Sequence, residues 1–188
     1  CIERGRRQIQ RKFIQSADLV IGLGFDTIEV EYEAWVGNTP VLSIDIEDPD
    51  IAQSVNLVGT VTGNITASLE YFLKQPVKQN TWTGKELSEH LREFNTALRP
   101  PSQNFTPHRA IDIVRETLPK NGIVSYDVGA HTHQIASQWK AHSPKTCHVT
   151  NGWSSMGIGL PGAIAAKIAR PDLPVVCLIG DGCFQMTG

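Results

Sequence analysis

Residues 174–188 read PVVCLIGDGCFQMTG, an apolar run that ends in a carboxylate between two glycines. Residues 175–179 are apolar without alternation, which is typical of a parallel strand covered on both faces. Open α/β sheets bind ligands outside the carboxyl ends of such strands, and Asp181 lies at this end. Its glycine neighbours let a ligand approach the backbone. A carboxylate beside exposed N–H groups suits a magnesium ion that holds a diphosphate.

A glycine-rich loop and a helix of small residues precede this strand. Residues 154–162 read SSMGIGLPG, in which Pro161 suits the first turn of a helix. The residues that follow predict a slender helix that packs close to the sheet, since they include Ala163, Ala165, Ala166 and Ala169. Taken alone, Met156 is interpreted as an ordinary core methionine.

Two motifs in this region resemble the thiamine-diphosphate-dependent enzymes. Residues 180–187, GDGCFQMT, are similar to the start of their cofactor motif, in which GDG is followed downstream by a paired asparagine. Residues 154–167, SSMGIGLPGAIAAK, resemble the preceding segment of acetolactate synthases, pyruvate oxidases and benzoylformate decarboxylases. A lone GDG is a weak signal. The two motifs stand in the right order, however, and the helix and strand between them have the right length.

Composition points to a globular protein without a nucleic-acid or membrane-surface footprint. The chain has 188 residues, of which 40% are hydrophobic and 19% charged, and its formal net charge is -2. The basic residues between Arg4 and Lys12 are interpreted as the solvated face of a helix. Four cysteines without a CxxC pair favour a reducing compartment. No signal peptide or spanning apolar run is present, so we expect a cytoplasmic location.

The sequence predicts an α/β fold with two Rossmann-like parallel-sheet domains, both incomplete. Residues 1–75 contain strands near 17–26, 40–46 and 57–61, and they resemble the carboxyl-terminal part of the superfamily's middle domain. Residues 76–106, which are rich in polar residues and proline, predict an inter-domain linker with a helix over 84–98. Residues 107–188 resemble the first part of the diphosphate-binding domain. The chain starts without methionine and stops just after a motif, so it is expected to be a fragment.

The glycines of the first domain leave two interpretations open. Gly22 and Gly24 fall short of GxGxxG because Thr27 stands at the third position, so a tight βα turn competes with a dinucleotide site. The acid at Asp45 is either a ribose ligand or part of an acidic loop that caps the next helix. Residues 24–29 lack the arginine of the FAD-binding synthases and look more like the FAD-free catabolic acetolactate synthases. The sequence therefore argues against FAD.

The predicted cofactor site lies where two strands of one sheet end, after Val128 and after residue 179. The helix start after Gly129 offers free N–H groups to a phosphate. His131 and His133 are too few and too close for a zinc site. The resemblance implies a cofactor-binding set made up of Val128, Gly129, Ala130, His131, Ser154, Met156, Asp181, Gly182 and Cys183.

The resemblance also implies a role for most members of this set. Asp181 would ligate Mg²⁺, and Ser154 would present its backbone to the aminopyrimidine. Met156 would lie under the cofactor and bend it. His131 would either contact the diphosphate or pack locally. At Cys183, as at Gly182 and Ala130, we expect contacts through the backbone, since Cys183 and Ala130 differ from the side chains usual in the family.

The implied activity is magnesium- and thiamine-diphosphate-dependent carboligation or decarboxylation of 2-oxo acids, with pyruvate converted to acetolactate as the leading case. Another 2-oxo acid decarboxylase or a pyruvate oxidase-like enzyme is the alternative, and a non-catalytic nucleotide-binding module is a distant one. The activating glutamate of the family and its paired asparagine match no residue here. The chain alone is therefore expected to be inactive, and the whole enzyme to be a homo-oligomer, either a dimer or a tetramer.

Overall fold

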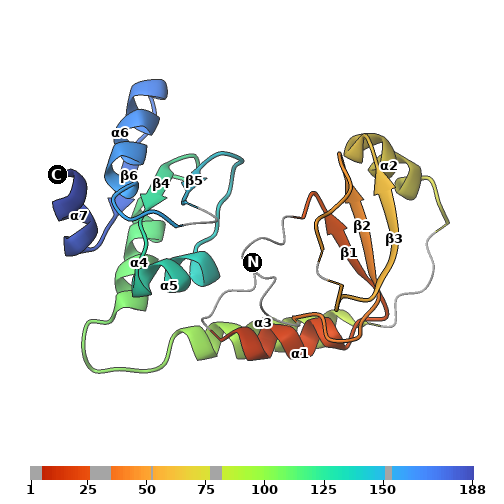
Figure 1. Cartoon of the computed structure of the whole chain (residues 1–188). Helices are drawn as coiled ribbons and strands as arrows, with labels where there is room; N and C mark the ends of the chain where they lie inside the picture. Colours follow the sequence, from red (N-terminus) through yellow and green to blue (C-terminus); the bar gives the residue numbers. More distant parts are fainter. Residues whose placement is uncertain (1–5, 26–34, 52, 77–81, 151–153) are drawn as a thin grey trace. The chain divides into compact units, whose positions relative to one another are not determined.

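The computed structural model describes residues 6–25, 35–51, 53–76, 82–150 and 154–188. These residues form two compact units, Arg6–Phe94 and Asn95–Gly188, and each unit contains a three-stranded parallel sheet with helices beside it (Figure 1). The α/β class predicted from the sequence is therefore confirmed. The predictions made for Thr27 and for most of the arginine-free segment, residues 24–29, lie outside the described residues. No helix in the described ranges is long and apolar enough to cross a membrane.

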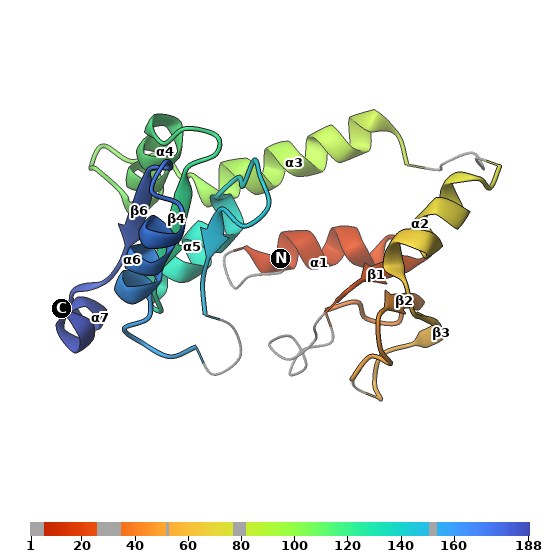
Figure 2. The same ribbon diagram turned by 90° about the horizontal axis from the view of Figure 1, so that it is seen from above.

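The first unit is organised around the sheet β1-β2-β3, whose strands are all parallel. Its elements are α1 (Arg7–Gln15), β1 (Val20–Leu23), β2 (Val41–Asp45), β3 (Leu57–Thr62), α2 (Ile65–Leu73) and most of α3 (Gly84–Leu98), as Figure 2 shows from above. Asn64 caps α2, since its Oδ1 accepts the backbone N–H of Ala67 at 3.0 Å.

The core of this unit is small and aromatic. Trp35, Val36 and Val41 are buried, with Val20 and three other apolar residues packed against them. The ring of Phe13 on α1 stacks on His90 of α3 at a centroid distance of 4.0 Å. These contacts hold α1 and α3 together through apolar surface.

The acidic loop after β2 caps no helix, so that interpretation of the Asp45 region was wrong. In the described residues between β2 and β3 no helix forms. Oδ1 of Asp45 instead accepts the N–H of Ile46 at 2.6 Å, and Oδ1 of Asp48 accepts the hydroxyl of Thr62 at 2.7 Å. The carboxylates are thus used in local turn contacts.

The second unit contains α4 (Pro107–Thr117), β4 (Ile123–Tyr126), α5 (Ala130–Gln138), β5 (Cys147–His148), α6 (Gly159–Ala169), β6 (Val175–Leu178) and α7 (Asp181–Thr187). Its sheet has the order β5-β4-β6, and both pairings are parallel. The central strand β4 is buried at all four positions. At every position β6 is half-buried, because β6 is an edge strand in the described part of this sheet. The prediction that residues 175–179 are covered on both faces is therefore wrong for β6 in the described part of the sheet. The strand that is buried on both faces is β4.

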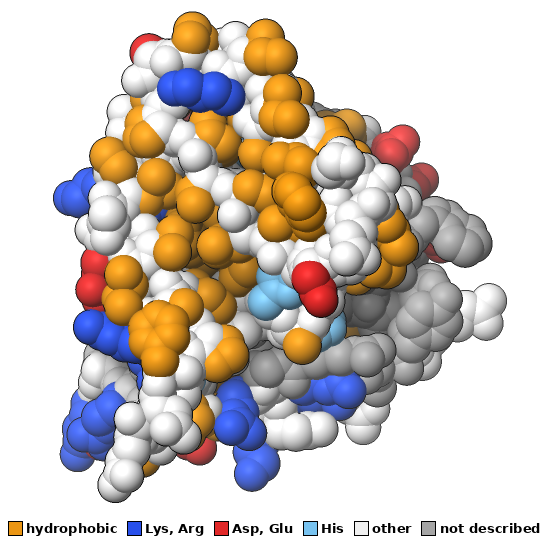
Figure 3. Space-filling view, turned by 90° about the vertical axis from the view of Figure 1, so that its left-hand side faces the viewer, with side chains coloured by type: hydrophobic (Ala, Val, Ile, Leu, Met, Phe, Trp, Pro, Cys, Tyr) orange, Lys and Arg blue, Asp and Glu red, His pale blue; other side chains and the backbone are white. Residues whose placement is uncertain are grey.

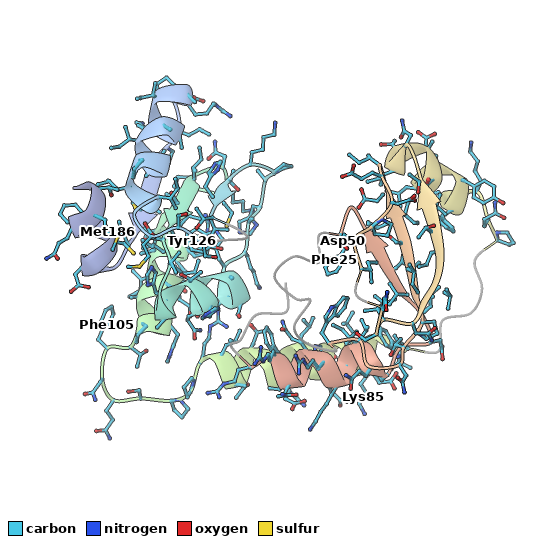
Figure 4. All side chains as sticks on the ribbon, viewed as in Figure 1. Phe25, Asp50, Lys85, Phe105, Tyr126 and Met186 are labelled. Atoms are coloured by element: carbon cyan, nitrogen blue, oxygen red, sulfur yellow. The ribbon has the colours of Figure 1, made fainter. Side chains whose placement is uncertain are left out.

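Helices cover the two faces of this sheet. On one face Ile111 of α4 and Ile135 of α5 pack on Val124 and Tyr126, and Figure 4 shows Tyr126 inside the unit. On the other face α6 lies against β4 and β6. The hydroxyl of Ser125, on this second face, donates to the carbonyl oxygen of Gly159 at 2.8 Å. The predicted close packing of the small-residue helix is confirmed.

A polar network joins the end of α3 to α4 and α5. The guanidinium of Arg99 donates to both carboxylate oxygens of Asp112, at 2.8 Å each. Nε2 of Gln138 donates to Oδ1 of Asp112 at 2.8 Å. Thr106 stands at the N-cap of α4, yet its side chain makes no cap bond because its hydroxyl lies 3.0 Å from Nε2 of His108.

Replacement of Asp112 by asparagine is expected to lower the free energy of unfolding by about 1–2 kcal/mol at pH 7. The hydrogen bonds from Arg99 hold the pKa of Asp112 below its ordinary value. A depressed pKa stabilises the folded state above the unfolded-state pKa, and that contribution is lost as the pH falls through the folded-state pKa. The gap between the two proteins should therefore close below about pH 4. Urea denaturation from pH 7 to pH 3 measures it, and a gap that does not change with pH would contradict the prediction.

Candidate functional site

The carboxyl ends of β4 and β6 lie side by side. The two strands are parallel neighbours, and their last residues, Tyr126 and Leu178, are paired in register. Each strand leads into a glycine that starts a helix: Gly129 precedes α5 and Gly180 precedes α7. The N-cap residues of both helices are glycines, so neither N-cap supplies a capping side chain. The prediction that the two strand ends meet at one edge of the sheet is confirmed.

The imidazole of His131 lies between these two turns. A Cβ atom built on Gly129 would lie 2.9 Å from two atoms of the ring, and one built on Gly180 would lie 3.8 Å from the ring. The Nε2 atom of His131 is buried and has no hydrogen-bond partner among the described residues. A ring nitrogen of this kind can donate to or accept from a ligand atom.

Asp181 is exposed at the first position of α7. Its Oδ1 accepts the N–H of Gly182 at 2.9 Å, and no salt bridge engages it among the described residues. No cluster of three or more His, Cys, Asp or Glu side chains suited to a metal occurs in the described part of the chain. Mg²⁺ needs only one or two carboxylates when phosphate oxygens and water complete its shell. A single open carboxylate therefore suits a magnesium ion shared with a ligand.

The segment from Ser154 to Gly159 reaches the same edge of the sheet. Ser154 has a left-handed backbone conformation with φ 48°, and Gly157 has φ 92°. A Cβ atom on Gly157 would lie 2.8 Å from Cγ2 of Thr187, so this segment packs against α7. Met156 is 49% exposed, which excludes a core role for it within the described residues.

The carboxylate of Asp127 binds this segment to β4. Oδ2 accepts the N–H of Gly159 at 2.8 Å, and Oδ1 accepts the N–H of Gly157 at 3.1 Å and that of Val128 at 2.7 Å. Burial is the largest single influence on the pKa of Asp127 and raises it. The N–H groups of Gly159, Val128 and Gly157 and the thiol of Cys183 together outweigh burial, and the pKa lies below its ordinary value.

Cys183 is buried and faces inward. Its sulfur lies 3.4 Å from the carbonyl oxygen of Val128, and the thiol also interacts with Asp127. Burial, followed by the neighbouring carboxylate, raises the pKa of the thiol. The side chain of Cys183 therefore packs against the residues that directly follow β4, which leaves the backbone of α7 as the part able to meet a ligand.

Sequence reasoning missed Asp127. It follows the apolar run of β4 directly and precedes a glycine turn, which is the same pattern that singled out Asp181 after β6. The two positions have opposite environments, since Asp127 is 0% exposed whereas Asp181 is exposed. Burial depends on the whole fold, so the local pattern alone does not separate them.

Hydrophobic side chains gather on the face of the second unit that carries α6 and α7 (Figure 3). Ile164 and Ile168 on α6 are 53% and 76% exposed. Phe184 and Met186 on α7 are 52% and 61% exposed, and Figure 4 shows Met186 at the margin of the unit. We refer to these four residues as the α6–α7 apolar surface.

Residues 127–188 match the family model described as thiamine pyrophosphate enzyme, C-terminal TPP binding domain. The chain is 27% identical to the probable acetolactate synthase large subunit of Methanococcus aeolicus, an alignment that covers 92% of this chain and 32% of that protein. It is 29% identical to the acetolactate synthase large subunit of Lactococcus lactis subsp. lactis (strain IL1403), over 91% of this chain and 31% of that protein. It is 28% identical to acetolactate synthase 3, chloroplastic, of Brassica napus, in an alignment that covers 92% of this chain and 28% of that protein. The chain thus spans about a third of the length of these relatives.

Proposed function

Because the chain belongs to the thiamine-diphosphate-dependent superfamily and is acetolactate synthase-like, we propose that it serves carboligation or decarboxylation of 2-oxo acids. The leading reaction joins two pyruvate molecules to acetolactate with loss of CO₂. The observation that carries the proposal is the convergence of two helix starts with glycine at the N-cap and one exposed carboxylate at a single sheet edge, inside the segment that matches the cofactor-binding family.

The residues at this edge fit a diphosphate. The ring of His131 lies between the turns at Gly129 and Gly180. Its buried Nε2 atom has no hydrogen-bond partner in the described part of the chain, and a phosphate oxygen at this place would supply one. The backbone N–H groups at the starts of α5 and α7 are the second set of donors. We propose that Val128, Gly129, Ala130, Gly182 and Cys183 contact the cofactor through their backbone at this edge.

Asp181 is proposed as a magnesium ligand. It is exposed, it lies beside the turn that the ring of His131 approaches, and no salt bridge among the described residues competes for it. A diphosphate and the carboxylate of Asp181 are both negatively charged and would repel each other. A divalent cation bound by both would replace this repulsion by attraction.

Ser154 and Met156 are proposed to contact the rings of the cofactor. Met156 exposes a large apolar side chain on the segment that Asp127 holds against β4, and Ser154 offers its backbone two residues earlier. Thiamine diphosphate, when bound, supplies a carbon nucleophile and a sink for the electron pair released by decarboxylation. The residues of this chain would hold it, orient it and keep water away from it.

Three further features of the enzyme are also proposed. Absence of FAD is proposed from the sequence of residues 24–29, most of which lie outside the described residues. A homo-oligomer with a pyrimidine-binding glutamate from elsewhere is proposed from the family resemblance. A cytoplasmic location is proposed because the described cysteines, Cys147, Cys177 and Cys183, are free thiols.

The proposal predicts that thiamine diphosphate raises the melting temperature of the natural protein that carries this sequence only when Mg²⁺ is present. Asp181→Ala should abolish that rise, because the bridge between carboxylate and diphosphate is lost. A ligand present at a hundred times its Kd stabilises a protein by about 2.7 kcal/mol, which makes the shift readily measured. Differential scanning calorimetry with each component alone and with both components gives the comparison.

Asp172→Ala is the matched control, since Asp172 is an exposed carboxylate of the same unit that forms an ion pair with the exposed Arg170. This variant should keep the full shift. Stabilisation of the natural protein by NAD, with none by thiamine diphosphate and Mg²⁺, would contradict the proposal and favour a nucleotide-binding module.

A further inference from the structure

Asp127 has an unusual environment for a carboxylate. Its side chain is 0% exposed, and it is the only acidic side chain in the buried set of the described residues. Oδ1 receives two backbone N–H groups, from Val128 and Gly157, while Oδ2 receives the N–H of Gly159. A buried carboxylate persists only when its oxygens are satisfied in this way.

The partners of this carboxylate come from three segments that are far apart in the sequence. Val128 follows β4, Gly157 lies just before α6 and Gly159 at its start, and Cys183 lies on α7. The hydroxyl of Thr132 on α5 also donates to the backbone carbonyl of Asp127. One residue therefore ties every segment of the proposed cofactor site to the end of the central strand.

The packing leaves this arrangement little freedom. A Cβ atom on Gly159 would lie 3.0 Å from Cβ of Asp127, and one on Gly157 would lie 2.8 Å from Thr187. Met156 immediately precedes Gly157, and Ser154 lies two residues before Met156. A movement of the carboxylate would therefore shift the segment that bears both proposed ring contacts.

The same environment excludes a direct role in chemistry. The carboxylate is shielded from solvent, and both of its oxygens already accept hydrogen bonds from the backbone. It therefore has no open oxygen for a metal ion, a substrate or a transferred proton.

We propose that Asp127 is a positioning residue, whose buried carboxylate holds the Ser154–Gly159 segment and α7 in the arrangement that binds thiamine diphosphate. The proposal rests on the proposed function, because the cofactor is the ligand whose binding this arrangement serves. The residue acts through Gly157, Gly159 and Cys183.

Asp127→Asn in the natural protein that carries this sequence tests the proposal. The amide keeps the size of the side chain, but its NH₂ group cannot accept a hydrogen bond. Exchange of the backbone amide protons of Gly157 and Gly159, followed by NMR, should become about tenfold to a hundredfold faster. The Kd for thiamine diphosphate with Mg²⁺, measured by calorimetry, should rise by about tenfold or more, because the segment with Met156 no longer keeps its position.

Asp112→Asn is the control for general destabilisation. Like Asp127→Asn, it removes the charge of a hydrogen-bonded carboxylate in the same unit. The partners of Asp112 are Arg99 and Gln138, which lie outside the proposed cofactor site. This variant should leave both the exchange of the two glycine amides and the Kd for the cofactor unchanged. An equal rise in Kd in both variants would overturn the proposal, since it would show an effect of stability alone.

If Asp127→Asn fails to fold, Cys183→Ala decides the question. It removes one partner of the carboxylate and leaves a small apolar side chain in the buried position. The amide of Gly157 should exchange faster, and the Kd should rise by a smaller factor, about threefold. Unchanged exchange and unchanged Kd would overturn the proposal.

The two measurements also separate this inference from the proposed function. Faster amide exchange with an unchanged Kd would overturn the positioning role while cofactor binding stands. No binding of thiamine diphosphate and Mg²⁺ by the unaltered protein would overturn the proposed function, and the positioning role toward that cofactor with it.

Discussion

Replacement of Asp127 by alanine is expected to lower the free energy of unfolding by about 3–5 kcal/mol, the largest effect of any substitution considered. The carboxylate accepts three backbone N–H groups, and alanine leaves those of Gly157 and Gly159 buried without an acceptor. Each such donor costs about 1–3 kcal/mol, and the cavity left by the carboxylate adds to this. Urea denaturation followed by circular dichroism measures the change.

The control for this substitution is Asp172→Ala, whose side chain is 63% exposed. An exposed ion pair contributes little, so the control should stay within about 0.5 kcal/mol of the unaltered protein. A loss below about 1 kcal/mol for Asp127→Ala would show that water reaches the freed N–H groups and that the carboxylate does not organise the site.

Gly159→Ala is expected to cost about 1–3 kcal/mol. The added Cβ would lie 3.0 Å from Cβ of Asp127 and 3.2 Å from its backbone nitrogen. These atoms belong to the buried end of the central sheet, so they cannot move aside as the end of a flexible side chain can. The start of α6 must shift instead, which lengthens the hydrogen bond from Gly159 to Asp127. Thermal unfolding gives the loss as a lower melting temperature.

Gly182→Ala is the matched glycine substitution. Position 182 lies inside α7, and an added Cβ would meet nothing within 4 Å. Alanine in a helix is favoured over glycine by up to about 1 kcal/mol, so stability should stay the same or rise. Equal losses at the two positions would contradict the steric argument for Gly159.

Much of the fold was predictable because its elements have strong local signals. Residues 84–98 were predicted as a helix, and α3 spans the same residues. It begins with a capping box, in which the carboxylate of Glu86 accepts the N–H of Thr83 at 2.7 Å. The apolar runs of β2, β3, β4 and β6 were likewise found within one or two residues of their ends. The two-residue strand β5 was missed, since two residues carry no periodic pattern.

The error at the acidic loop has a physical cause, which is that the hydrogen-bond partners of polar side chains depend on the folded surroundings. Asp45 and Asp48 bind a neighbouring N–H and the hydroxyl of Thr62 in place of a helix start. At the N-cap of α4, the hydroxyl of Thr106 likewise lies against His108 and makes no cap bond. Position along the chain was predictable in these cases, whereas the choice of hydrogen-bond partner was not.

The candidate site was predictable to a similar extent. Glycine turns after two adjacent strands identified the edge at which His131 and Asp181 lie, and the structure places both there. The prediction that residues 128–131, Ser154, Met156 and Asp181–Cys183 bind the cofactor stays a prediction. Asp127 escaped notice because its importance comes from Gly157 and Gly159, about thirty positions away.

The α6–α7 apolar surface affects how the molecule behaves in concentrated salt. With a net charge of only -2, electrostatic repulsion between molecules is weak. Sulfate and phosphate, being excluded from protein surfaces, strengthen the attraction between exposed side chains such as Ile168 and Met186. Added sulfate or phosphate is therefore expected to favour association of exposed side chains such as these.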